Sequence, residues 1–293
     1  MYYFIVDPNV QKGRGEQVWK KLEHQLLAAG VEYQLRLAGE QGEAQKVAHE
    51  LTEGCKEEIV IVAVGGDHFV NEILNGISFG CQISFGYILT DSDNNFARSL
   101  RLSGNPRRRL KKILNPKHYR YLDYGILTYG SQEPVYRRFA VSCGIGMDTV
   151  LCQPAQKLCS RIKKKLYFLC AKPAKGYLLL DGVKKVEFNN IYFVSCHIQP
   201  FEGGFLFAPK ADPSDGFLEV CVAHHASKRK LFQTLLAASL RRAKRQRGIH
   251  FYKCREVQIH LDRPMGVHAD GGYCREHSDI HVRCVERKLR MLM

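Results

Sequence analysis

The sequence has no long apolar run, and no segment approaches the roughly 18 apolar residues that a membrane-spanning helix needs. The apolar run Tyr2–Val6 is too short for the hydrophobic region of a secretory signal peptide, and we expect it to form a strand. Internal repeats and low-complexity segments are also absent. We therefore expect any contact with a membrane to be peripheral.

The eleven cysteines lack any spacing that would indicate a metal or redox site. No C-x-x-C pair occurs, and no group of cysteines and histidines has the spacing of a zinc site. The pattern predicts mostly buried thiols in a reducing cytoplasm.

Acidic residues are in the minority, since 29 Asp and Glu stand against 44 Lys and Arg, a formal net charge of +15. So large an excess favours polyanionic partners, which are anionic lipids, nucleotides or nucleic acid. The apolar fraction of 45% and charged fraction of 25% are typical of a globular protein. A chain of 293 residues can form one large or two smaller domains.

Strand and helix patterns alternate in the first part of the chain, which predicts a parallel sheet covered by helices. The predicted strands are 2–6, 31–37, 59–64 and 83–89, and helical stripes fall at 18–26, 44–51 and from about 69. From about Tyr119 strand patterns dominate, with two helical insertions near 149–170 and 227–247. We predict an α/β domain at 1–118 and an antiparallel β-sandwich at 119–293, whose last residues can return to the first domain. The basic stretch 105–116 is the expected boundary.

The stretch from Ile59 to Ile77 organises the first domain. Six apolar residues predict a buried strand, Gly65 and Gly66 allow a sharp turn, and a short helical pattern follows. A glycine turn that opens a helix is a common cradle for phosphate, because free N–H groups and the helix dipole favour an anion. Asp67 suits a divalent metal on that phosphate. An ordinary βα turn with a surface aspartate remains equally compatible with the spacing.

This stretch, Gly65-Gly66-Asp67-His68-Phe69 and then 70–77, resembles the signature of the diacylglycerol kinase catalytic family, which includes bacterial lipid kinases and sphingosine kinases. The family usually has Gly-Gly-Asp-Gly-Thr, so His68 and Phe69 depart from it. The resemblance covers nearly the whole chain. It implies a nucleotide-binding α/β domain, a β-sandwich, and transfer of the γ-phosphate of ATP to a lipid hydroxyl with Mg²⁺.

A second stretch, 90–98, resembles the family's Leu-Gly-Thr-Gly-Asn-Asp-Phe-Ala-Arg, which helps to bind nucleotide. Asp91 and Asp93 replace both glycines. A carboxylate about 4 Å from a phosphate oxygen costs on the order of 4 kcal/mol at an effective dielectric near 20. The loop therefore either holds a metal or no longer holds a triphosphate. The resemblance implies a nucleotide site made of Gly65, Gly66, Asp67, Asn71, Glu72, Ser92, Asn94 and Arg98. The loop that begins at Asp7-Pro8 is similar to the family's first loop.

Two further motifs supply candidate metal ligands. Gly144-Ile-Gly-Met-Asp148 resembles the family's Gly-x-Gly-x-Asp, so Asp148 is a candidate for organising a metal or its waters, or an N-cap for the next helix. The stretch 209–220 is similar to a family turn that can hold a structural Mg²⁺, with Asp215 as the matching carboxylate. A plain Asp-Gly turn explains the same residues.

His268-Ala-Asp270-Gly271-Gly272 takes the place of the family's Asp-Gly-Glu, which lies beside the phosphate acceptor. Asp270 is the expected general base, and with Asp67 it makes up the predicted catalytic pair. The family's glutamate is Gly272 here. Loss of a general base typically costs about 10²–10⁴ in rate.

Residues 227–247 combine a leucine face with basic ends, and 161–169 is a second basic stretch. Basic amphipathic helices lie on anionic bilayers. The alternative is a helix packed through its leucines with its charges in water. No nucleic-acid-binding module is recognisable, so we expect no nucleic-acid partner.

Three functions therefore remain. The first is a cytoplasmic, peripherally membrane-associated lipid kinase that uses ATP and Mg²⁺ on a diacylglycerol-like acceptor, alone or as a homodimer. The second is a catalytically silent relative that binds or regulates at a membrane surface. The third is a kinase with a soluble acceptor, because NAD kinases share a Gly-Gly-Asp-type loop.

Overall fold

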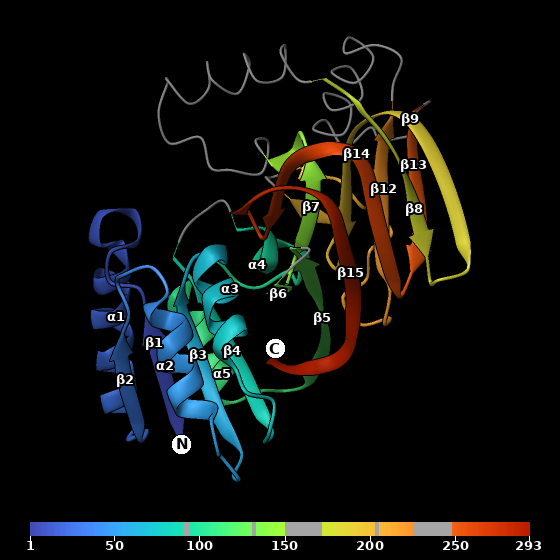
Figure 1. Cartoon of the computed structure of the whole chain (residues 1–293). Coiled ribbons are helices and arrows are strands. Elements are labelled where there is room, and N and C mark those ends of the chain that lie inside the picture. Colours follow the sequence, from blue (N-terminus) through green and yellow to red (C-terminus); the bar gives the residue numbers. More distant parts are fainter. Residues whose placement is uncertain (91–93, 131–132, 150–171, 203–204, 225–247) are drawn as a thin grey trace. The chain divides into compact units, whose positions relative to one another are not determined.

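The computed structural model describes residues 1–90, 94–130, 133–149, 172–202, 205–224 and 248–293 (Figure 1). Ser92 and the predicted basic helix at 227–247 lie outside these residues, as do Asp91, Asp93 and nearly all of 149–170. The chain divides into two compact units. Unit 1 comprises Met1–Asp123 and Arg287–Met293, and unit 2 comprises Tyr124–Glu286.

Unit 1 contains a run of five strands in which each neighbouring pair is parallel. Its order is β2 (Tyr33–Leu37), β1 (Tyr2–Val6), β3 (Ile59–Gly65), β4 (Ile83–Leu89) and the end of β15 (Gly272–Leu292). Strand β3 lies near the middle, and its residues Ile61 to Val64 are fully buried. The β-branched residues of this run suit a strand that is covered on both faces.

Five helices accompany this sheet among the described residues: α1 (Val10–Ala28), α2 (Glu43–Thr52), α3 (Asp67–Gly76), α4 (Asn95–Ser99) and α5 (Pro106–Leu114). Val18, Leu22 and Leu26 of α1 share an apolar cluster with Leu110 and Ile113 of α5. Helix α2 packs against α3 (Figure 1). Because α1, α3 and α4 follow the carboxyl ends of the parallel strands β1, β3 and β4, the loops that begin these helices share one edge of the sheet.

The predicted boundary at 105–116 folds instead as α5, inside unit 1. Asn105 caps the helix by accepting a hydrogen bond from the Arg108 backbone N–H, and Pro106 occupies its first turn. Arg109 is only 1% exposed. Its guanidinium donates to the backbone oxygens of Tyr87 and Leu292, which joins α5 to β4 and to the end of β15.

Unit 2 consists of antiparallel strands. They are β6 (Val135–Phe139), β7 (Ser142–Gly146), β8 (Ala174–Leu180), β9 (Lys184–His197), β12 (Leu218–His224), β13 (Ile249–Cys254) and β14 (Glu256–Ala269), with a short hairpin of β10 (Phe201–Glu202) and β11 (Phe205–Leu206). Strand order runs β13-β12-β9-β7-β14-β15, and β8 pairs with both β9 and β14. Strands β5 (Tyr119–Tyr129) and β15 continue from one unit into the other.

No helix among the described residues is both long and apolar enough to cross a membrane.

Candidate functional site

The glycine turn of unit 1 lies between β3 and α3, where Gly66 is the N-cap residue of the helix. A Cβ atom on Gly65 would lie 2.7 Å from Cδ1 of Phe69, which is too close for any real contact. Phe69 is 6% exposed. Glycine is therefore needed at position 65 because the Phe69 ring packs directly on the turn.

Asp67, the first residue of α3, joins the glycine turn to the second predicted nucleotide motif. Its carboxylate accepts hydrogen bonds from the backbone N–H groups of Asn95, at 2.7 Å, and Phe96, at 3.3 Å. These N–H groups belong to the first turn of α4, where they have no partner within the helix. Asp67 therefore caps α4 from a position 28 residues earlier in the chain.

Asn94 and Tyr87 make a second link between the two motifs. The Asn94 side chain accepts from the Ala97 backbone N–H at 2.6 Å, and its amide nitrogen bonds to the Tyr87 hydroxyl. That hydroxyl in turn donates to the backbone oxygen of Gly65 at 3.2 Å. Two stretches that the sequence assigned to one nucleotide site thus lie together in unit 1, and Arg98 lies on the exposed side of α4.

Glu72 connects α3 to the start of α2. One carboxylate oxygen accepts from the Gly42 backbone N–H at 3.1 Å, and the other lies 3.5 Å from Nδ1 of His68. Asn71 is 1% exposed, and its backbone oxygen accepts from the Asn75 side chain at 2.8 Å. Both residues make contacts that brace the helices behind the turn.

The first loop also reaches this edge of the sheet. The Asp7 carboxylate accepts hydrogen bonds from the backbone N–H groups of Asn9, at 2.9 Å, and Val10, at 3.1 Å. Burial raises the pKa of Asp7, against the lowering effects of these two hydrogen bonds and of nearby His68. Asp7 and Asp67 thus place carboxylates in the loops that begin α1 and α3.

A magnesium ion in a kinase site is usually held by one or two carboxylates together with phosphate oxygens and water. Asp67 supplies a carboxylate of this kind, because it is the first residue of α3 and directly follows the glycine turn. In the part of the chain that the structure describes, no three His, Cys, Asp or Glu side chains are grouped to hold a metal ion by themselves.

A cavity of about 410 Å³ lies between α1 and α5 in the same unit. Arg14, Lys21 and Arg107 contribute three cationic groups to its walls, and no carboxylate lines it. The remaining lining residues are Gln17, Val18, Asn105 and Pro106. Such a cavity stabilises an anion.

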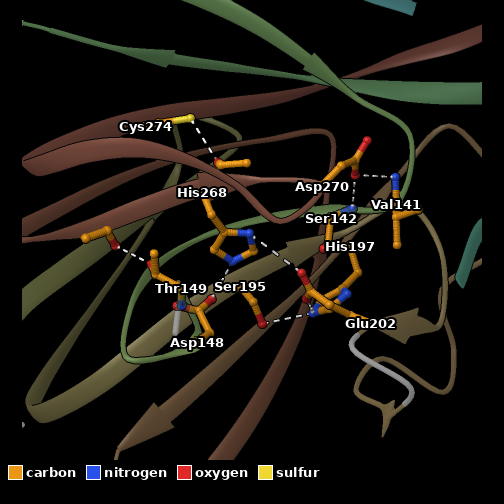
Figure 2. Close-up of polar contacts among 12 residues, drawn as sticks. Val141, Ser142, Asp148, Thr149, Ser195, His197, Glu202, His268, Asp270 and Cys274 are labelled. Carbon is orange, nitrogen blue, oxygen red and sulfur yellow. Dashed lines mark hydrogen bonds and ion pairs between the residues drawn. The ribbon is translucent and has the colours of Figure 1, made fainter. Parts of the chain in front are cut away.

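Unit 2 contains a buried polar cluster of Asp148, His268, Glu202, His197 and Ser195, shown in Figure 2. All five residues are between 0 and 3% exposed. His268 lies between the two carboxylates, with Nε2 3.2 Å from Asp148 Oδ2 and Nδ1 3.6 Å from Glu202 Oε1. Nε2 of His197 lies 2.9 Å from the Ser195 hydroxyl and 3.9 Å from Glu202 Oε2.

The pKa values of the two histidines in this cluster are shifted in opposite directions. Burial by itself would lower the pKa of His268, but the charges of Asp148 and Glu202 together raise it to about 9. Burial, helped by the charge on His268, lowers the pKa of His197 to about 3. Near neutral pH the cluster therefore holds a charged His268 and a neutral His197.

Gly144 makes room for the ion pair. It lies opposite His268 on β14 and opposite Ser195 on β9. A Cβ atom on Gly144 would lie 2.0 Å from Asp148 Oδ2 and 2.8 Å from His268 Nε2. The Gly-x-Gly-x-Asp motif thus has a packing explanation, and Asp148 also accepts from the Thr149 backbone N–H at 2.9 Å.

Asp270 lies in the tight turn between β14 and β15. Asp270 and Gly271 have φ values of 45° and 77°, as the two central residues of a type I′ hairpin require. The Asp270 carboxylate accepts hydrogen bonds from the backbone N–H groups of Ala140, Val141 and Ser142 at 2.7 to 3.0 Å. These contacts hold the hairpin against the segment that enters β7.

The same arrangement recurs at Asp181, far from any predicted motif. Asp181 has a φ of 51° and precedes Gly182 in the turn between β8 and β9. Its carboxylate accepts from the Arg255 backbone N–H at 2.8 Å and from that of Glu256 at 3.0 Å. Because a turn without a predicted catalytic role uses it too, the arrangement favours a structural role for Asp270.

Gly272 and Asp215 have cationic neighbours. A Cβ atom on Gly272 would lie 2.9 Å from a guanidinium nitrogen of Arg137, so a glutamate at this position would meet a positive charge. Asp215 accepts from Lys253 Nζ at 2.7 Å and from the Phe217 backbone N–H at 3.0 Å. An ammonium group is therefore the charged partner of this predicted magnesium ligand.

Sequence reasoning missed the contributions of Tyr87, Arg109, Glu202 and His268. His268 carried one usable signal, because it belongs to the motif His268–Gly272 that the sequence had singled out. Glu202 carried none, since it lies in a two-residue strand without a motif.

Comparison with known proteins matches both parts of the chain. The family described as diacylglycerol kinase catalytic domain matches residues 1–126, and the YegS C-terminal NAD kinase beta sandwich-like domain matches residues 154–293. The chain is similar to YtlR of Bacillus subtilis, a lipid-kinase candidate, with 21% identity over 286 residues and 92% of each chain covered. It is also similar to a diacylglycerol kinase of Mycobacterium tuberculosis, with 22% identity over 241 residues, which are 79% of this chain and 76% of that one.

Two solved structures resemble this chain. A diacylglycerol kinase from Bacillus anthracis has a TM-score of 0.73 at 19% identity, over 99% of this chain and 96% of the other. An NAD kinase from Archaeoglobus fulgidus, in complex with ATP, has a TM-score of 0.56 at 14% identity, over 100% and 94%. At these identities the likeness establishes the fold alone, which is a mixed α/β fold with many antiparallel strands and a C-terminal β-sandwich-like domain.

Proposed function

Because the chain belongs to the diacylglycerol kinase catalytic family and continues into a YegS-type C-terminal domain, we propose that it is a lipid kinase. It would transfer the γ-phosphate of Mg²⁺–ATP to a lipid hydroxyl such as that of diacylglycerol. One observation carries this proposal: Asp67 and Tyr87 bond the Gly65–Asp67 turn to the Asn94–Arg98 segment in unit 1.

The residues of unit 1 divide the work of binding. The N–H groups that open α3 favour a phosphate, because they have no partner within the helix and carry the positive end of its dipole. Asp67 would hold the magnesium ion, which supplies charge neutralisation on the phosphate oxygens. Asn94 would keep its loop in place, and the exposed Arg98 would reach the nucleotide.

The acceptor would be a lipid in an anionic membrane surface, reached from the cytoplasm. The net charge of +15 and the cationic cavity between α1 and α5 support an anionic partner. The resemblance assigns Asp270 to proton transfer, whereas its three backbone hydrogen bonds favour a role in fixing residues 140–142.

A catalytically silent relative is the second candidate, and a specific observation favours it. Phe69 stands where the family has a small threonine, and its ring packs on Gly65. The Asp67 carboxylate accepts hydrogen bonds from backbone N–H groups of α4. Both contacts fill space and donors that a phosphate would use. A member with this turn would bind membranes or partners without phosphoryl transfer.

Binding of Mg²⁺–ATP to the full chain, measured by thermal shift and calorimetry, tests the proposal. A ligand at 100 times its dissociation constant stabilises the folded state by about 2.7 kcal/mol, which is readily measured. Binding followed by radiolabel transfer to diacylglycerol vesicles supports the kinase. Binding without transfer of phosphate to lipids or NAD supports the silent relative. An unchanged melting temperature at millimolar nucleotide contradicts the kinase proposal.

Reversion of the altered turn gives a sharper test. The double substitution His68→Gly and Phe69→Thr removes the ring from Gly65 and restores the usual family residues. We expect nucleotide affinity to rise about tenfold or more, since one hydrogen bond to a charged group contributes about 1.5–3 kcal/mol. The matched control adds Asp67→Asn to the same pair. If the control gains as much affinity, Asp67 does not hold the metal.

A further inference from the structure

The cationic cavity between α1 and α5 has two well-defined walls. Its volume of about 410 Å³ is within the usual range of small-molecule pockets. One wall is a single face of α1, because its lining residues recur at the spacing of a helical stripe: Arg14, Gln17, Val18 and Lys21. The start of α5, at 105–107, is the other wall. None of the described residues of the predicted nucleotide site lines this cavity, so it is a separate place for a ligand.

The core of unit 1 fixes the position of both walls. Val18 is only 9% exposed, and it shares an apolar cluster with Leu22 of α1 and Leu110 of α5. The start of α5 is held by Arg109, whose guanidinium donates to backbone oxygens of β4 and β15. Because packed helices support both sides, the cavity belongs to the fold and does not depend on exposed side chains alone.

The three cationic groups of the cavity differ from a neighbouring lysine in their charge partners. In the part of the chain that the structure describes, none of Arg14, Lys21 and Arg107 forms an ion pair with a carboxylate. Arg14 donates instead to a neutral side-chain amide at 3.0 Å. Lys20, by contrast, lies 2.8 Å from the carboxylate of Glu16. The cavity therefore concentrates positive charge that the described residues leave uncompensated.

The charges at the start of α5 also oppose the polarity of the helix. Acidic side chains stabilise the first turn of a helix, and basic side chains weaken it. The first turn of α5 contains no acidic residue and carries Arg107 and Arg108 instead. The first turn of α1 likewise has no acidic residue. An anion in the cavity would remove this conflict at the start of α5, which is a second reason to expect one.

We propose that the cavity binds the dianionic phosphate of a phosphomonoester. A phosphomonoester carries about −1.5 to −2 charges at pH 7, so it matches three cations better than a phosphodiester with a charge of about −1. Arg14 and Arg107 offer planar guanidinium groups that suit phosphate oxygens, and Lys21 adds a point charge. The ligand is either a lipid headgroup or a soluble phosphomonoester. Its binding needs no phosphoryl transfer, so the proposal applies to an active kinase and to a silent relative alike.

Methyl phosphate and dimethyl phosphate, added to the full chain at constant ionic strength, test the proposal by thermal-shift titration. We expect methyl phosphate to bind about tenfold more tightly or better, because of its additional charge. The triple substitution Arg14→Gln, Lys21→Gln and Arg107→Gln should weaken its binding on the order of 100-fold, at a factor of about five for each cation. Neither compound requires ATP or Mg²⁺, so the result is independent of kinase activity.

A matched control removes three charges from the same two helices outside the cavity. The substitutions are Lys20→Gln, Arg108→Gln and Lys112→Gln. At physiological salt we expect methyl phosphate affinity to stay within about threefold of the parent, because exposed charges away from the ligand are largely screened. An equal loss in the control would mean that overall charge and not the cavity binds the phosphate. Binding that survives in the cavity triple variant would place the ligand elsewhere. Either result overturns the proposal.

Vesicle flotation distinguishes the two sources of the phosphate. Phosphatidylcholine vesicles with phosphatidate present a phosphomonoester, and vesicles with phosphatidylglycerol present a phosphodiester at matched surface charge. If the ligand is a lipid headgroup, the parent floats preferentially with the phosphatidate vesicles, methyl phosphate displaces it, and the cavity triple variant loses the preference. If the ligand is soluble, methyl phosphate binds to the parent but phosphatidate gives no preference. An absence of binding in both experiments contradicts the proposal.

Discussion

The glycine turn of unit 1 and the buried cluster of unit 2 use the same pair of residue types for different purposes. Gly65 leaves room for an aromatic ring, whereas Gly144 leaves room for a carboxylate and an imidazolium. Asp67 is satisfied by neutral backbone amides, and Asp148 by the charged ring of His268. Glycine followed by aspartate therefore predicts a close approach, but it does not predict which group approaches.

The largest expected effect is a loss of stability in the variant Gly144→Ala, and its size distinguishes Gly144 from Gly65. Gly144→Ala places a Cβ atom 2.0 Å from Asp148 Oδ2 and forces the buried ion pair apart. Breaking a buried pair costs about 3–5 kcal/mol, because a charge is left without its partner. Urea unfolding of the variant should show a loss of this size. A loss under about 1 kcal/mol would mean that the pair is not held in place by this contact.

The pH dependence of stability is the next effect. His268 has a folded pKa of about 9 against an ordinary 6.5. Because the folded pKa is raised, its contribution of about 3 kcal/mol is fully present below pH 6.5 and is lost as the pH rises through 9. His197, with a folded pKa lowered to about 3, acts oppositely, so stability falls as the pH drops below 6.5.

The free energy of unfolding should therefore peak near pH 6.5. Denaturation of the parent and of His268→Gln across pH 5–10 measures this. The substitution should flatten the alkaline side and keep most of the acid side, because burial is the main cause of the low pKa of His197. An unchanged alkaline slope would show that His268 is not the charged member of the cluster.

Gly65→Ala should cost less than Gly144→Ala, although its Cβ also meets an atom within 3 Å. The neighbour here is the Phe69 ring, which can rotate, and overpacking of this kind typically costs about 1–3 kcal/mol. Combining Gly65→Ala with Phe69→Thr should recover most of the loss in urea unfolding. If the double variant is no more stable than Gly65→Ala, something other than the ring requires the glycine.

Asp67→Ala is the smallest change, because it removes a cap and leaves no buried charge. Loss of a capping side chain typically costs about 0.5–2 kcal/mol. Asp67→Asn should lower the free energy of unfolding by less than half as much, since an amide oxygen can still accept a hydrogen bond from the backbone of Asn95 or Phe96. Thermal melts of both variants check the order, and equal losses would show that the negative charge matters more than the hydrogen bonds.

Local patterns in the sequence predicted the strands and helices of unit 1 well. The run Ile59–Val64 is β3, and the helical spacing after Asp67 is α3. The basic stretch at 105–116 was harder, because a run of arginines suggests an exposed linker. Arg109 is buried, and one of the carbonyl groups that accept from it belongs to Leu292, 183 positions away in the chain. Local patterns carry no information over such a separation, so the sequence did not predict this burial.

The same limit applies to the buried cluster. Asp148 and His268 are 120 residues apart, and each looked like part of a separate motif. Turn chemistry, by contrast, is local, so Asp215-Gly216 was recognisable as a turn. The roles of Asp67, Asp148, Asp215 and Asp270 in binding or catalysis stay predictions.

The return of β15 to unit 1 has a consequence for synthesis of the protein. Arg290 and Met291 pair with β4, and Arg109 bonds to Leu292, so the edge of β4 is covered by residues that are synthesised after unit 2. Until they emerge, the nascent chain presents an uncovered edge strand and a guanidinium lacking one carbonyl acceptor. Unit 1, although it is made first, cannot finish folding before translation of unit 2 is complete.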